Sequence, residues 1–90
     1  MTTYIPIGHD NRGTPEAPFG YVYLARSKRG NSIGRLGYGP SRDNPDPLAV
    51  WPTSDTPADL SRGTIYQARA YLARQWPDLV RDRVPCASPP

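Results

Sequence analysis

The stretch GYVYLARSKRGNSIGRLGYGP, residues 20–40, contains three tyrosines and four basic residues but no acid. Residues 20–26 are rich in β-branched and aromatic types, which are typical of strands, and residues 32–38 can pair back on them. Between the two segments, Gly30-Asn31 suits the positive φ angles of a tight hairpin turn. The stretch therefore predicts a β-hairpin, and the rest of the fold is built on this hairpin.

The hairpin has two faces, because side chains alternate along each strand. A two-residue turn at Arg29-Gly30 or at Gly30-Asn31 gives the same assignment of residues to faces. One face is expected to hold Tyr21, Tyr23, Ala25, Gly34, Leu36 and Tyr38. The other face is expected to hold Val22, Leu24, Arg26, Ile33, Arg35 and Gly37.

Two further strands are indicated on either side of the hairpin. Residues 3–7 form a short N-terminal strand at a sheet edge, since Pro6 cannot donate to a ladder. Residues 48–51 form an apolar strand that Pro52 stops.

One helix is predicted over residues 65–76. Thr64 and Gln67 have the spacing of a capping box. Behind them, apolar residues recur at helical spacing, and Pro77 should end or break the helix. The residues of this apolar face are Ile65, Ala68, Leu72 and Trp76.

These elements predict the α+β class: a three-stranded antiparallel sheet packed by one C-terminal helix, in the order βββα, with the N-terminal strand as an optional fourth. Ninety residues fit a single small domain, which we place at 1–84. Residues 85–90 are expected to be a disordered, proline-rich tail. One helix can cover only one face of the sheet. If it covers Val22, Leu24 and Ile33, the tyrosines Tyr21, Tyr23 and Tyr38 lie on the uncovered face. If it covers the tyrosines, they belong to the core; the first alternative is preferred.

The sequence offers little for catalysis or metal binding. Cys86 is the only cysteine and His9 the only histidine, so this chain has no internal disulfide and too few soft ligands for a zinc site. Glu16 is the only glutamate, and the aspartates lie mostly in expected turns, where turn chemistry explains them. We therefore expect no catalytic residues, no metal, no cofactor and no enzymatic activity.

The chain is expected in the cytoplasm, or in the host cytoplasm if a phage encodes it. No apolar run reaches the roughly 20 residues of a membrane span, and the N-terminus lacks a signal-peptide pattern. The net charge of +3 and the pI of about 9.4 are compatible with an acidic protein partner or with nucleic acid. Membrane binding is not expected, and the oligomeric state stays open.

Positive charge gathers at the bend of the hairpin, in a basic tip formed by Arg26, Lys28 and Arg29. With the expected faces, Arg35 lies across from Arg26, and like charges in that position repel. An anion on a partner would relieve this repulsion. The candidate partner-binding residues are Tyr21, Tyr23, Arg26, Lys28, Arg29, Arg35 and Tyr38.

Two partial family resemblances imply other functions. GYVYLARS (20–27) followed by LGYGPSRD (36–43) resembles the start of a GIY-YIG nuclease domain, with Tyr23, Tyr38 and Arg42 in the places of its two tyrosines and its arginine. That family needs a helical glutamate for its metal, and no glutamate follows Glu16. The resemblance therefore implies a degenerate, inactive relative.

LAVWP (48–52) followed by AYLARQWPDL (70–79) is similar to MbtH-like proteins, small βββα helpers of adenylation enzymes. Trp51-Pro52 and Trp76 match that family's tryptophans, although their spacing is shorter than usual. The resemblance implies that both tryptophans bind a partner. The alternative is that they close a small core.

Together these observations favour a small, non-enzymatic accessory module that binds an acidic protein surface through the basic Tyr/Arg hairpin. Nucleic-acid binding is the alternative, since alternating aromatic and basic residues suit single strands. The composition also resembles that of accessory proteins of phages and mobile elements, many of which inhibit a host machine by occluding it.

Overall fold

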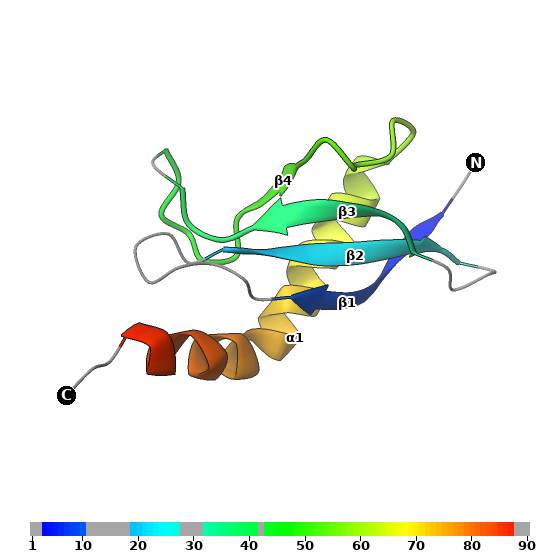
Figure 1. The fold of residues 1–90 in the computed structure, drawn as a ribbon. Coiled ribbons are helices and arrows are strands. Elements are labelled where there is room, and N and C mark those ends of the chain that lie inside the picture. Colours follow the sequence, from blue (N-terminus) through cyan, green and yellow to red (C-terminus); the bar gives the residue numbers. More distant parts are fainter. Residues whose placement is uncertain (1–2, 11–18, 28–31, 42, 88–90) are drawn as a thin grey trace.

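A computed structural model of the chain describes residues 3–10, 19–27, 32–41 and 43–87, without the side chains of Ser32 and residues 80–87. The chain forms one four-stranded antiparallel sheet followed by one helix (Figure 1). This confirms the predicted α+β class. The elements are β1 (Tyr4–Asp10), β2 (Gly20–Arg26), β3 (Ser32–Tyr38), β4 (Val50–Pro52) and α1 (Arg62–Ala87).

The strands follow one another across the sheet in the order β1-β2-β3-β4, so the N-terminal segment supplies the fourth strand. The expected strand at 48–51 forms two residues later, as β4. A turn accounts for the delay, because the Asp46 carboxylate accepts from the Leu48 N–H (2.9 Å) and the Asp46 carbonyl accepts from the Ala49 N–H (3.0 Å). Residues 46–49 form this turn, so the strand that pairs with β3 begins at Val50.

The pairing of β2 with β3 contains a register shift that changes the faces of the hairpin. Near the turn, Ala25 lies opposite Ser32, but the next pair is Leu24 with Gly34. Ile33 is the extra residue, as in a β-bulge. Because side chains alternate, one inserted residue moves the rest of β3 to the other face. The predicted faces of β3 relative to β2 were therefore wrong, and Leu36 shares its face with Val22, not with Tyr21.

The core lies between the sheet and the helix. Figure 1 shows α1 behind the sheet, crossing the strands, while the front of the sheet carries no second layer. The helix covers the face of Val22 and Leu24, as in the preferred alternative, but that alternative was wrong for Ile33, which is 40% exposed, and for Tyr38, which is buried. The core cluster of fully buried residues consists of Val22, Leu24, Leu36, Tyr38, Ala68, Leu72 and Leu79.

Tyr38 belongs to this core, although the sequence placed it with the other tyrosines. Its side chain is fully buried, and its hydroxyl donates to the Asp10 carbonyl at 2.7 Å. Gly20, its partner on β2, leaves the space that the Tyr38 ring fills. The bulge at Ile33 is the cause, since it turns Tyr38 toward the helix.

Helix α1 is longer than predicted at both ends. It begins at Arg62 because Ser61 caps it: the Ser61 Oγ accepts from the Thr64 N–H at 3.3 Å. The expected capping box at Thr64 was therefore wrong. The helix also passes through Pro77 and changes direction in its orange part (Figure 1). Proline lacks the N–H for one helical bond, which explains a bend.

The helix as described runs to Ala87 and so includes residues 85–87 of the expected tail. Residues 88–90 lie outside the described residues, and the tail there stays a prediction.

The Ser61 cap should be measurable. Ser61→Ala is expected to lower the free energy of unfolding by about 1 kcal/mol, because it removes the side-chain acceptor of the Thr64 N–H and leaves only the Ser61 carbonyl at 3.1 Å. Urea denaturation followed by circular dichroism measures the change. Ser54→Ala, at an exposed turn residue, serves as the control. Equal midpoints for the two variants would contradict the assigned helix start.

Arg69 ties the turn before β4 to the helix. Its guanidinium donates to the Leu48 carbonyl (2.8 Å) and pairs with the Asp46 carboxylate (2.7 Å). The hydrogen bond from the Leu48 N–H is the main cause that lowers the pKa of Asp46 below its ordinary 3.8, and the hydrogen bond from Arg69 is the second. This contact holds the loop 46–48 against the outer side of α1.

A lowered carboxyl pKa stabilises the fold above the unfolded-state value and ceases to do so as the pH falls through the folded-state value. We therefore expect the melting temperature to fall when the pH drops below 3.8, and to fall less in Asp46→Asn. The difference should be small, since both side chains are partly exposed. Identical pH profiles for the two proteins would contradict a folded-state role of this carboxylate.

Candidate functional site

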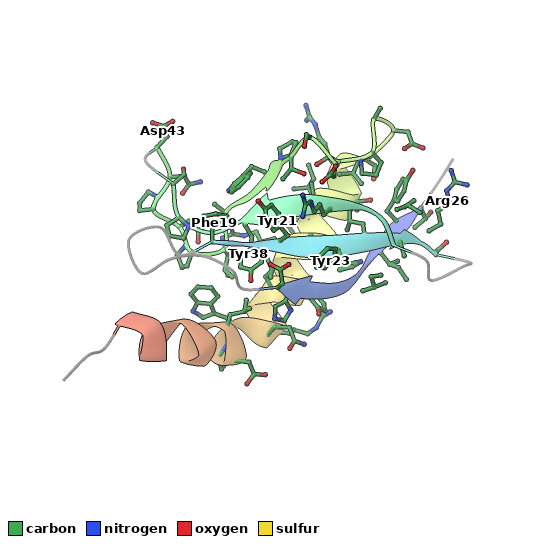
Figure 2. The ribbon with its side chains drawn as sticks, in the orientation of Figure 1. Phe19, Tyr21, Tyr23, Arg26, Tyr38 and Asp43 are labelled. Atoms are coloured by element: carbon green, nitrogen blue, oxygen red, sulfur yellow. The ribbon has the colours of Figure 1, made fainter. Side chains whose placement is uncertain are left out.

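The front of the sheet forms the candidate site. Tyr21 and Tyr23 alternate with the buried Val22 and Leu24, so their half-buried rings lie on the side away from the helix. Figure 2 shows Phe19, Tyr21 and Tyr23 along the front of the sheet, with α1 behind it. We call this surface the open face and define it by Phe19, Tyr21, Tyr23, Arg35 and Trp51.

A glycine allows the largest ring of the open face to lie close to the sheet. Trp51 is directly opposite Gly37, which in turn is opposite Tyr21. A Cβ atom at Gly37 would lie 2.1 Å from the Trp51 ring, so the indole packs on the bare glycine backbone. On the other side of Tyr21, Phe19 meets it edge to face, with ring centroids 6.1 Å apart. Phe19 therefore contacts Tyr21 directly, while Trp51 lies over the cross-strand neighbour of Tyr21, Gly37.

Arg35 lies at the centre of the open face, where it contacts both Tyr21 and Asp55. Its guanidinium carbon lies 4.3 Å from the centroid of the Tyr21 ring, a cation–π distance. Its Nε donates to the Asp55 carboxylate at 2.6 Å, and this hydrogen bond is the main reason that the pKa of Arg35 is raised. The charge of Arg35 is therefore paired within the chain.

The expected repulsion between Arg26 and Arg35 is not found. The register places Arg35 opposite Tyr23 and Arg26 opposite Tyr4. The same bulge that redirects Tyr38 separates the two arginines. Repulsion between them cannot be the reason for an anionic partner.

A shallow depression adjoins the rings. It is lined by Tyr23, Ile33, Gly34, Arg35 and Asp55. The Tyr23 hydroxyl donates to the Asp10 carboxylate of β1, which holds the ring in place at one wall. Ile33, 40% exposed, adds an apolar wall. The depression therefore combines apolar surface with one ion pair.

The charge of the open face is close to neutral. Arg35 is accompanied by the carboxylates of Asp55 and Asp10. The exposed Arg26 lies at the end of β2, whereas Lys28 and Arg29 of the basic tip lie outside the described residues. Aromatic surface, more than positive charge, characterises this face.

The predicted site residues are thus only partly brought together. Tyr21, Tyr23 and Arg35 meet on the open face, while Tyr38 is buried behind it and Arg26 lies at its end. Phe19 and Asp55 were not predicted from the sequence, and Trp51 was indicated as a partner-binding residue only through the resemblance to MbtH-like proteins. Phe19 could have been found, because it continues the alternation of Tyr21 and Tyr23 by one step. Trp51 and Asp55 join the site only through the register of β4 and the turn after it.

The aspartates around the open face and the core have structural partners. Asp10 binds Tyr23, Asp55 binds Arg35, and Asp59 accepts from the Tyr4 hydroxyl at 2.6 Å. Within the described ranges, His, Cys, Asp and Glu side chains form no group of three that could hold a metal ion. Over the same ranges, no helix has the length and apolar character needed to cross a bilayer.

No protein-family model, no curated protein and no solved structure matches this chain. The two partial resemblances therefore rest on the quoted residues alone. The structure places Trp51 on the open face and Trp76 against the core on the helix side. Of the residues that resemble the nuclease motif, Tyr23 is on the open face, Tyr38 is in the core, and Arg42 lies outside the described residues.

Proposed function

We propose that this protein is a non-enzymatic binding module that holds a partner protein on its open face. One observation carries the proposal: the rings of Tyr21 and Tyr23 line the face of the sheet that the helix leaves uncovered. Tyrosine gives large contact area with few rotatable bonds, so ordering it on binding costs little entropy. Aromatic residues and arginine are enriched at the centres of protein interfaces.

The geometry of the face supports a binding role. Phe19 packs beside Tyr21, Trp51 packs on Gly37, and Asp10 holds Tyr23, so the rings are positioned before a partner arrives. A pre-organised surface loses less entropy on association. The aspartates there serve these contacts, which supports a structural role for them and not a catalytic one.

Charge favours a protein over a nucleic acid at this face. A phosphate backbone needs cations, but Arg35, the cation at the centre of this face, is already paired with Asp55. The basic tip would meet acidic residues of the partner at the edge of the contact, where Arg26 is exposed. Such binding would occlude whatever surface the partner presents, as an inhibitor of a host machine does.

Nucleic-acid binding is the second candidate, because rings on a sheet surface can stack on unpaired bases. Fluorescence anisotropy with single-stranded and double-stranded oligonucleotides, at two salt concentrations, separates the candidates. A single-strand binder would lose about 0.7 log units of affinity per log unit of salt for each phosphate contact. We expect no specific binding to either oligonucleotide.

The protein partner is tested by affinity capture from cells that express the chain. Tyr21→Ala should reduce the amount of captured partner at least about tenfold, as expected for a central interface aromatic. Gln67→Ala changes an exposed side chain on the helix that belongs neither to the open face nor to the hollow beside Tyr66, and it serves as the control. Circular dichroism confirms that both variants fold. Equal capture by both variants and the parent chain would refute a contact at the open face.

A further inference from the structure

The outer side of α1 carries a second surface that the open face does not explain. Tyr66 is 75% exposed, more than any other large hydrophobic side chain among the described residues. One turn and two turns further along the helix, Ala70 and Ala73 lie on the same side, because residues four and seven apart share a helix face. Small residues beside a projecting ring leave a hollow.

This hollow has walls from two parts of the chain. It is lined by Leu48, Tyr66, Arg69, Ala70 and Ala73, so the loop before β4 contributes as well as the helix. Arg69 holds that loop in place through the Leu48 carbonyl and the Asp46 carboxylate. The hollow is therefore built by fixed contacts within the chain.

The residues around the hollow carry more positive than negative charge. Between Arg62 and Pro77 the helix contains three arginines and no acidic residue. The Asp46 carboxylate pairs with Arg69, which leaves the exposed Arg62 and Arg74 on the helix. Arg74 also lies near the Tyr71 ring, 6.0 Å from its centroid. A partner at this surface gains from carrying negative charge.

We propose that this hollow docks an acidic segment of another protein, which inserts one apolar side chain between Tyr66 and the two alanines. Carboxylates of the segment would then meet Arg62 and Arg74 on either side. Charge complementarity selects the segment, and the Tyr66 ring supplies most of the contact area. This surface lies on the opposite side of α1 from the sheet, so the proposal does not depend on the open face.

A pair of synthetic peptides tests the proposal with the full chain. The probe is a capped peptide of glutamates with leucines at helical spacing, and its control has lysines in place of the glutamates. Titrations are followed by NMR shifts of backbone amides. We expect the glutamate peptide to shift the amides of Tyr66, Ala70 and Ala73, and the lysine peptide to leave them unchanged.

Two variants identify the contacts. Tyr66→Ala should weaken binding of the glutamate peptide about tenfold, and so should Arg62→Gln combined with Arg74→Gln. All of these side chains are exposed, so the variants should keep the melting temperature of the parent chain. Equal binding of the lysine peptide, undiminished binding by Tyr66→Ala, or no binding of the glutamate peptide would overturn the proposal. Tyr21→Ala should bind the peptide normally, which separates this test from that of the open face.

Discussion

Replacing Leu24 by alanine is expected to lower the free energy of unfolding by about 2–5 kcal/mol, the usual cost of truncating a buried leucine. Leu24 is fully buried between β2 and the helix, where it belongs to the same cluster as Leu36 and Leu72. A chain of this size has only about 5–10 kcal/mol of stability in total. The variant should therefore be largely unfolded near its former melting temperature.

Ile33→Ala is the matched control for Leu24→Ala. Ile33 is 40% exposed, so its truncation should cost less than about 1 kcal/mol. Urea denaturation at equilibrium, followed by tryptophan fluorescence, gives both values. A larger loss for Ile33 than for Leu24 would contradict the position of the helix and would place the core on the other face of the sheet.

The second large effect is expected at Gly20. A Cβ atom there would lie 2.0 Å from the Asp10 carbonyl oxygen and 2.5 Å from the Tyr38 hydroxyl. The Gly20→Ala variant must therefore move β1 or expel the Tyr38 ring and lose its hydrogen bond to Asp10. We expect a loss of about 3 kcal/mol from overpacking and the broken bond.

Gly8 provides a control in the neighbouring strand. An added Cβ at Gly8 would meet no atom within 4 Å, so Gly8→Ala should change the free energy of unfolding by less than about 0.5 kcal/mol. Thermal melting of the two alanine variants measures the contrast. Similar melting temperatures would mean that the Tyr38 ring does not pack on Gly20.

The sequence predicts the elements of this fold better than their relative positions. The β-branched and aromatic run at 20–26 identifies β2, and the spacing of Ala68 and Leu72 identifies the buried side of α1. These are local patterns whose periods distinguish strand from helix. The bulge at Ile33 has no such pattern, since it depends on which register buries the most apolar surface.

The extra residue in β3, Ile33, accounts for much of the difference between the predicted site and the observed one. It moved Tyr38 into the core, and it removed Arg35 from the neighbourhood of Arg26. The pairing of Arg35 with Asp55 joins residues twenty apart, and it depends on the turn after β4. Long-range contacts of this kind follow from tertiary packing, and neither local propensity nor charge counting reveals them.

The C-terminal end of α1 also shows what rules based on neighbouring residues in the sequence omit. Pro77 disfavours helix at the residue before it, yet α1 continues to Ala87 with a bend. Packing of Leu79 against the core supplies a reason for continuing, because it buries apolar surface beyond the proline. Tertiary burial outweighed the cost of one missing backbone hydrogen bond.

The binding role of the open face is tested most directly by the affinity of a purified captured partner for two variants, Tyr21→Ala and Gln67→Ala, measured by titration calorimetry. The account predicts that Tyr21→Ala binds this partner at least about tenfold more weakly than the parent chain, since it removes the central ring of the open face. Gln67→Ala should bind it with unchanged affinity, since Gln67 is exposed and lies outside the open face. Unchanged affinity for Tyr21→Ala, in a variant that keeps its fold, would contradict the claim that the open face is the binding surface.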